Sequence, residues 1–242
     1  TEWSPYAGAY HSVVESLLKL LAMGVDPLKA RLTFQEYFER MTADSHSWGK
    51  PLSALLGALK MQLEFGLPSI GGKDSMSGTF EDLNVPPTLI AFGITSEKVG
   101  NIISPEFKKA GNYVYVIRHK ALANYMPDTD MLKCNWDFTR SQILQKNIVS
   151  AWSVSFGGVA EGLAKMAFGN GIGARVYAPE SELFNMEYGS LIVESVSPLG
   201  YENAVLLGRT IPEAVLEIND VPMELDALYS CNLSRYENVY PS

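Results

Sequence analysis

The feature that most constrains this chain is a short segment rich in glycine and hydroxyl groups, residues 70–79, which reads Ile-Gly-Gly-Lys-Asp-Ser-Met-Ser-Gly-Thr. Gly71 and Gly72 let the backbone approach a ligand closely and reach positive φ without a Cβ clash. Lys73 brings a mobile ammonium group, which suits a phosphate, and Asp74 and Ser75 add an acid and a hydroxyl. A Gly-Gly turn with a solvated Lys-Asp pair explains the same residues equally well. Residue chemistry alone therefore leaves an anion-binding segment and a plain turn both open.

The best-known phosphate-binding motif is the P-loop, Gly-x4-Gly-Lys-Ser/Thr. This segment departs from it, because five residues separate Gly66 from Gly72 and Asp74 stands where the metal-binding hydroxyl belongs. A P-loop also opens a helix, whereas this segment follows a predicted helix over 51–65. That helix is predicted from leucines on one face, with Pro51 near its start and Gly66 just past its end: Leu52, Leu55, Leu56, Leu59 and Leu63. The sequence therefore predicts a loop that runs from a helix toward a strand.

The composition is that of an ordinary globular protein, with 47% hydrophobic and 19% charged residues among 242. The formal net charge of −8 argues against a nucleic-acid surface or an anionic membrane surface as a partner. We expect no membrane span, because no segment reaches about 18 apolar residues, and we expect a cytoplasmic location. Cys134 and Cys231 form no CxxC motif and are too few for a disulfide scaffold. The abrupt start without an initiator Met predicts a part of a longer protein.

Periodicity predicts an α+β fold, because helices and strands occur without strict βαβ alternation. Helices are expected over 7–23, 34–41, 51–65 and 139–147 and from Gly157 onward; the helix over 34–41 would open with a capping box of Thr33 and Glu36. Strands are expected near 88–95, 113–117, 148–154, 175–177, 191–196 and 205–208, with a hairpin of 215–218 and 221–225 around Asn219-Asp220. The pattern weakens over 118–137, which predicts a boundary between domains of residues 1–118 and 119–242.

Residues 68–77, together with Pro86-Pro87-Thr88-Leu89-Ile90, resemble the long, single-chain form of phosphoribosylformylglycinamidine synthase. The resemblance continues through Gly57, Ala58, 107–112 and 157–173. This family forms an amidine in purine biosynthesis from ATP, glutamine and formylglycinamide ribonucleotide. The resemblance implies two aminoimidazole ribonucleotide synthase-like domains, an N-terminal-like domain truncated at its start and a C-terminal-like α/β sandwich.

The same resemblance assigns roles to the glycine-lysine segment. Gly71 and Gly72 match nucleotide contacts, and Asp74 and Ser75 match substrate contacts. A protonated lysine cannot ligate Mg²⁺, so Lys73 is expected to be catalytic by stabilising phosphate charge. That charge would assist phosphoryl transfer to the amide oxygen, before ammonia displaces the phosphate.

A second, auxiliary nucleotide site of the family matches residues 152–158 and the first helix. Ser155, Gly157 and Gly158 match nucleotide-contacting residues, and Glu15 matches a metal ligand. Lys19 stands in place of a metal-binding Asn, and Trp152, Ser153 and Phe156 replace a His and two acids. These changes shift the local charge by about two units, and each charge pair near a surface is worth ~4 kcal/mol. We therefore expect the magnesium–nucleotide site to be lost, with Lys19 close to Ser153, paired with Glu15 and facing a bare anion pocket.

Other chemistry has little support, because His11, His46 and His119 share no metal-like spacing and neither cysteine neighbours a histidine. The expected partners are ATP, formylglycinamide ribonucleotide and the rest of a synthase with its glutaminase domain, so the isolated chain should be inactive. A homodimer through residues 1–118 is also expected. Two alternatives stay open: a stand-alone aminoimidazole ribonucleotide synthase-like enzyme and a non-catalytic scaffold module. Turnover of ATP and substrate by the isolated chain would separate them.

Overall fold

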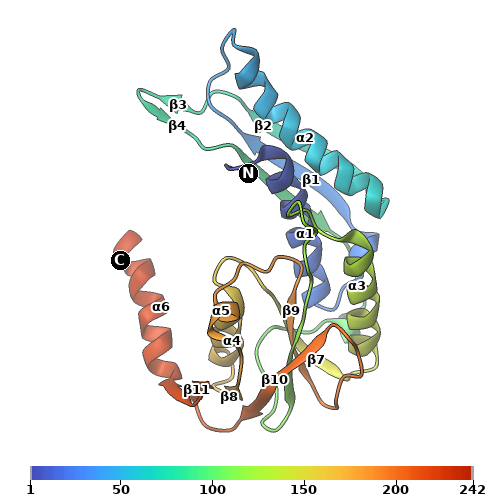
Figure 1. Ribbon diagram of the computed structural model, residues 1–242, viewed down its shortest axis with the longest axis vertical. Helices are drawn as coiled ribbons and strands as arrows, with labels where there is room; N and C mark the ends of the chain where they lie inside the picture. The colour runs from blue at the N-terminus through green and yellow to red at the C-terminus, as the bar shows by residue number, and fades with distance from the viewer. Residues whose placement is uncertain (1, 241–242) are drawn as a thin grey trace.

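The fold comes from a computed structural model that describes residues 2–240 (Figure 1). The helices are α1 (Pro5–Ala22), α2 (Ser45–Phe65), α3 (Thr129–Leu144), α4 (Gly158–Phe168), α5 (Glu180–Leu183) and α6 (Leu225–Val239), with 3-10 turns at Pro27–Lys29 and Val99–Asn101. The strands are β1 (Arg31–Tyr37), β2 (Ser69–Ser75), β3 (Thr79–Phe80), β4 (Leu83–Asn84), β5 (Thr88–Ile94), β6 (Tyr113–Ile117), β7 (Ile148–Ser153), β8 (Gly173–Val176), β9 (Leu191–Ser195), β10 (Ala204–Ile211), β11 (Val215–Ile218) and β12 (Val221–Glu224). The α+β prediction is confirmed. Over residues 2–240, no helix has the length and apolar character needed to cross a membrane.

A three-stranded sheet in the order β2-β1-β5 forms the first half of the molecule. β1 replaces the helix predicted over 34–41, so that prediction is wrong. Leu32, Phe34 and Glu36 are buried while the residues between them are more exposed, which is the period of a strand. The expected capping box misled the prediction: Thr33 and Glu36 instead point to opposite faces of β1. Phe and Tyr also favour strands when a sheet neighbour is available.

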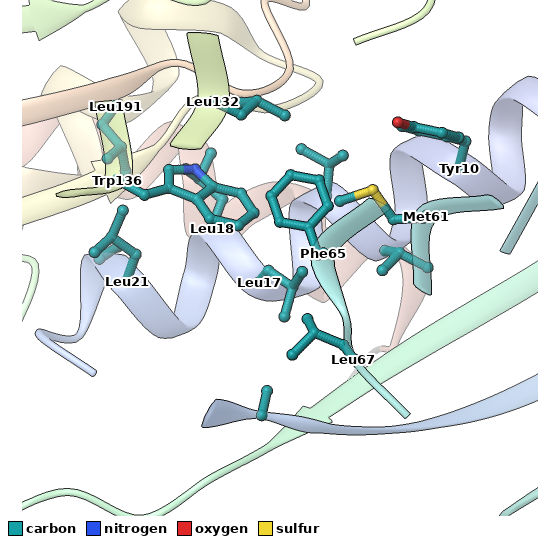
Figure 2. Packing of buried hydrophobic residues seen from close by; sticks show 14 of the residues in the cluster. Tyr10, Leu17, Leu18, Leu21, Met61, Phe65, Leu67, Leu132, Trp136 and Leu191 are labelled. Carbon is teal, nitrogen blue, oxygen red and sulfur yellow. The ribbon is translucent and has the colours of Figure 1, made fainter. Parts of the chain in front are cut away.

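α1 and α2 cover one face of this sheet, and their buried residues also pack against the second half of the molecule. Ser4 caps α1 and Pro5 opens it, as helix starts favour. Figure 2 shows Phe65 of α2 against Trp136 of α3, and their ring centres are 4.8 Å apart. One continuous hydrophobic cluster therefore joins the helices of the first half to β6, β7 and β9.

α2 begins six residues before the predicted start, at the cap Asp44, and ends at Gly66 in the left-handed region. Pro51 lies inside the helix and is buried. The side chains that face the core are small where α1 crosses. A Cβ on Gly57 would lie 2.1 Å from the carbonyl oxygen of Tyr6, so only glycine allows this approach. The predicted leucine face points the other way and is exposed.

A seven-stranded sheet in the order β12-β11-β8-β10-β6-β9-β7 forms the second half, with α4 packed on one face. The predicted hairpin is confirmed as β11 and β12, and both turn residues have positive φ, 51° for Asn219 and 65° for Asp220. β6, assigned to the first domain by sequence, pairs with β9 and β10 in the middle of this sheet. The division at residue 118 stays a prediction.

Two further differences concern helices. α3 starts at Thr129, ten residues before the predicted 139, because Asp128 accepts a hydrogen bond from the backbone of Met131 and caps the helix. The weak segment 118–137 thus contains the first half of a helix. α6 was not predicted from the sequence; it projects from the body, and Leu225 is its one buried residue (Figure 1).

Candidate functional site

The glycine-lysine segment is a strand, β2, and not the predicted loop. It lies at the edge of the small sheet and runs parallel to β1, with Lys73 opposite Gln35 and Ser75 opposite Tyr37. Neither Gly71 nor Gly72 uses positive φ. Gly72 is needed for a different reason: a Cβ there would lie 2.8 Å from the carbonyl oxygen of Phe34. The glycine lets two strands approach closely, and the pairing with β1 replaces the expected turn.

Strand geometry divides the predicted site residues between two faces, because successive side chains alternate. Lys73 and Ser75 share the open face of the sheet with Gln35 and Tyr37. Asp74 is paired with Glu36, on the face that the helices cover. The structure therefore brings Lys73 and Ser75 together and separates them from Asp74, which the sequence analysis had grouped with them.

The open face presents one cation above an aromatic ring. The Nζ of Lys73 lies 4.3 Å from the centre of the Tyr37 ring, within cation–π range. Beside these residues, Gln35 and Thr33 border a cavity of about 670 Å³ that also includes Ile90 and Phe92 of β5. The cavity also borders Glu15 and Lys19 of α1, whereas Lys73, Ser75 and Tyr37 are not part of its lining.

The covered face holds an unusual acid, Glu36, which is 3% exposed. Burial, followed by repulsion from Asp74, raises the pKa of Glu36 from 4.5 to about 7. Its Oε1 has no hydrogen-bond partner. A carboxyl group with this pKa is about half protonated at pH 7, so β2 lies beside a buried acid that takes up its proton near neutral pH.

In the region of the expected auxiliary nucleotide site, Lys19 is paired with Glu15, as the sequence predicted. The Nζ of Lys19 is 2.8 Å from Oε1 of Glu15, a pair spaced i,i+4 on α1. Lys19 also borders a cavity of about 340 Å³ together with Ser153, Ser155, Trp152 and Met23. Lys19 thus stands between an acid and two hydroxyls.

The start of α4 is not a bare anion pocket. The N–H of Gly157 donates to Oε2 of Glu161 at 3.0 Å, so a carboxylate of the same helix already occupies the anion position. Gly158 has φ of +69° and lies against the backbone of Leu183 and Phe184, where a Cβ would not fit. The Gly157-Gly158 turn therefore has a complete structural explanation.

The histidines and cysteines do not assemble into a site. His11 Nε2 is 2.9 Å from the carbonyl oxygen of Tyr125, and His119 is buried with both ring nitrogens hydrogen-bonded. Cys134 and Cys231 are free and exposed. Across residues 2–240, no group of three or more His, Cys, Asp or Glu side chains could hold a metal ion.

Sequence reasoning missed three residues of these sites: Tyr37 under Lys73, Glu36 beside Asp74, and the cap Glu161. The first two were hidden by the helix assigned to 34–41. Their signal in the sequence was the alternation of apolar and polar side chains from Leu32 to Gln35. Glu161 could have been found from its position, since an acid in the first turn of a helix stabilises free N–H groups.

A small sheet under two long helices is joined to a larger antiparallel-rich sheet with a helix on its face, and this fold is shared with PurL structures from Thermotoga maritima. The chain is similar to phosphoribosylformylglycinamidine synthase subunit PurL of Picrophilus torridus, with 25% identity over 98% of the chain and 34% of the relative. The resemblance to phosphoribosylformylglycinamidine synthase is thereby confirmed, while the long, single-chain form stays a prediction because the matched relative is a separate PurL subunit. The chain spans about a third of the length of this curated relative.

Solved structures agree on the fold. PurLQS from Thermotoga maritima matches 94% of the chain and 42% of its own, with a TM-score of 0.74 and 16% identity. The hydrogenase maturation protein HypE matches 87% of the chain and 78% of its own, with a TM-score of 0.65 and 14% identity. No protein-family profile matches the chain. Since proteins with different names share the fold, the fold alone does not decide the reaction.

Proposed function

We propose that this chain is a part of a phosphoribosylformylglycinamidine synthase and supplies one wall of its ATP and ribonucleotide site. The observation that carries the proposal is the position of Lys73 and Ser75 together on the open face of an edge strand, in a motif that resembles the synthase. Among the structural neighbours, T. maritima PurL has been solved with ATP and with FGAR. The open face would meet the remainder of the synthase. This chain matches only about a third of the length of its curated relative.

Lys73 is the proposed catalytic residue. Its ammonium is exposed, and Tyr37 below it restricts its motion, so it can meet a phosphate group presented from the open side. A fixed positive charge stabilises the charge that develops as phosphate moves to the amide oxygen. Ser75, two residues along on the same face, would bind the ribonucleotide, and Gly71, with open space beside it, would allow close approach of the nucleotide.

Asp74 and Gly72 receive different roles. Both positions lie on the face of β2 that Phe34 and Glu36 share, opposite to Lys73 and Ser75, so we propose that they position β2 and do not contact the ligands directly. Mg²⁺ belongs to the chemistry of the complete enzyme, where it would neutralise phosphate charge. Glu15 with Lys19 does not fit a cation, because the lysine ammonium already occupies the space beside the carboxylate, so no step is assigned to a metal here.

We propose further that the auxiliary nucleotide site is absent. Lys19 takes the place of a cation beside Glu15, and Glu161 takes the place of an anion at Gly157. Calorimetry with Mg-ADP should show no tight binding by this chain. The variant with Lys19→Asn and Ser153→Asp, which restores oxygen ligands, should gain some magnesium-dependent binding, and adding Glu161→Ala should increase it. Tight binding by the unmodified chain would contradict this account.

The first test of the overall proposal is turnover by the isolated chain. With ATP, formylglycinamide ribonucleotide and either ammonia or glutamine, we expect no amidine and no glutamate, because the glutaminase and the first half of the synthase are missing from this span. Glutamate release that disappears in Cys134→Ala or Cys231→Ala would contradict it. Amidine formation, or ATP turnover with another substrate, would favour a stand-alone enzyme such as an aminoimidazole ribonucleotide synthase-like protein.

The remaining proposals concern assembly and location. We keep the division into domains of residues 1–118 and 119–242, a cytoplasmic location, and self-association through residues 1–118 when the rest of the synthase is absent. A scaffold role, in which the chain only completes a partner's site, differs from catalysis by Lys73 in one measurable way. Under the scaffold role, Lys73→Met in a complete synthase would leave the rate constant unchanged.

A further inference from the structure

The outer face of α2 is an apolar surface with no partner among the described residues. Six large side chains of this helix are 46–72% exposed: Trp48, Leu52, Leu55, Leu56, Leu59 and Leu63. We call them the α2 stripe. Where α1 crosses, the inner face uses the small residues Ala54, Gly57 and Ala58, and Met61 and Phe65 are buried further along the helix. α2 lies along the margin of the molecule, and no other element covers its outer side (Figure 1).

The order of the stripe is symmetric along the helix. Its six positions are placed evenly about the midpoint between Leu55 and Leu56. When two copies of one helix pack antiparallel about a two-fold axis at that midpoint, Trp48 of each copy faces Leu63 of the other. Leu52 then faces Leu59, and Leu55 faces Leu56. Every large apolar residue meets another, which is the requirement of an isologous interface.

The charges near the stripe do not oppose this pairing. Lys50 is 2.6 Å from Glu39, and Lys60 is 2.8 Å from Glu64, so both lysines between Trp48 and Leu63 are already neutralised within the chain. Like charges brought together by the two-fold axis would otherwise weaken the contact. The stripe extends about 22 Å along the helix from Trp48 to Leu63, at about 1.5 Å per residue.

We propose that the α2 stripe is a self-association surface, and that its occupant is the α2 stripe of a second copy in antiparallel orientation. This inference rests on the self-association through residues 1–118 proposed above and names its surface, but it does not depend on the catalytic role of Lys73. A single helix pair falls short of the about 800 Å² per partner of a standard interface. The dimer is therefore weak and concentration-dependent.

Sedimentation of the whole chain over a range of concentrations tests the association. The chain should pass from monomer to dimer, and Leu56→Glu should raise the dissociation constant at least tenfold, because it places two carboxylates near the axis. Val99→Glu, at a residue 88% exposed on another surface, is the matched control and should not change the constant. Circular dichroism checks that both variants are folded.

Cysteine cross-linking tests the orientation, in a background of Cys134→Ser and Cys231→Ser. Leu55→Cys lies near the axis and should form a disulfide between copies. Leu63→Cys alone should form no disulfide, since its two copies are about 22 Å apart along the helix. The double variant Trp48→Cys with Leu63→Cys should form a disulfide between copies, because these two positions face each other.

Three results would overturn the proposal: a monomer at every concentration, a dimer that Leu56→Glu leaves unchanged, or efficient cross-linking by Leu63→Cys alone. A dimer dispersed by Phe92→Lys instead would place the contact on the open face of the small sheet. Each of these results is independent of whether Lys73 takes part in catalysis.

Discussion

The ammonium of Lys73 lies 4.3 Å from the centre of the Tyr37 ring, one strand away across the parallel pair of β1 and β2. An exposed cation–π contact is worth about 0.5–1 kcal/mol. The ring therefore restrains the lysine without holding it against a ligand. A group that must meet phosphate needs both restraint and freedom to move.

This contact gives a graded prediction for a complete synthase that contains this chain. Tyr37→Phe keeps the ring and should retain nearly full activity. Tyr37→Leu removes the ring and should lower kcat by about 2- to 5-fold, as expected from the cation–π energy. Steady-state kinetics with ATP and the ribonucleotide measures both. Equal losses in the two variants would show that the hydroxyl of Tyr37, and not its ring, is what matters.

Glu194 should be the most sensitive acid in the larger sheet. It is fully buried and accepts hydrogen bonds from the backbone of Lys108 and Lys109, from Asn112 and from Ser150. Replacing it by Gln turns one acceptor into a donor that faces these donors. We expect Glu194→Gln to cost about 3 kcal/mol of unfolding free energy.

Urea denaturation followed by circular dichroism checks this value. The matched control is Glu213→Gln, at an exposed acid between β10 and β11 of the same sheet. Its free energy of unfolding should stay within about 0.5 kcal/mol of that of the unmodified chain. A similar small change in Glu194→Gln would mean that the four donors do not depend on a charged acceptor.

We expect the contribution of Glu36 to the free energy of unfolding to fall as pH rises. Its folded-state pKa of about 7 exceeds the ordinary 4.5, mainly through burial, so the folded chain binds its proton more tightly than the unfolded chain does. Its contribution is complete below pH 4.5 and is lost as pH rises to about 7, a change of about 1–3 kcal/mol.

Urea denaturation of Glu36→Gln and the unmodified chain between pH 5 and pH 8.5 isolates this group. The two should be similar at the acid end, and the variant should be more stable at the alkaline end. Asp74→Asn removes the second cause of the shift and should narrow the pH window. A constant difference at all pH values would contradict the assignment.

His119 should make the folded chain less stable as pH falls, which is the opposite of the effect of Glu36. Burial lowers its pKa below 6.5 in the folded chain, and one ring nitrogen accepts the N–H of Asp128, the residue that caps α3. Protonation would remove that acceptor. Stability should therefore be full above about pH 6.5 and fall as pH drops below it. NMR titration of the ring should give a pKa below 6.5; an equal or higher value would contradict the burial argument.

The sequence predicted the elements whose signals are local. α1, β5, β6 and the β11–β12 hairpin needed only periodicity and turn residues. β1 could not be recognised in the same way, because Thr33 and Glu36 imitate a capping box and its sheet partners come from distant residues 69–75 and 88–94. The pairing with those strands decides its conformation, which a local pattern does not contain.

The candidate site was predicted in composition but not in geometry. The motif identified Lys73, Asp74 and Ser75, yet only strand pairing shows that Asp74 points away from the other two. The leucines of α2 give a parallel case. Periodicity found the stripe, but the small residues opposite it allow α1 to approach, so the stripe faces outward. Which apolar face is buried depends on the neighbour.

The most direct test of the central claim is the rate constant of a complete synthase that contains this chain, measured with Lys73→Met. We expect amidine formation by the unmodified assembly and a roughly 10²- to 10³-fold lower kcat in the variant, as for the loss of one preorganised charge at a transition state. Ser77→Ala, in the same segment beyond β2, serves as a control and should retain its activity. Full activity of Lys73→Met would contradict the claim that this strand stabilises the transferred phosphate.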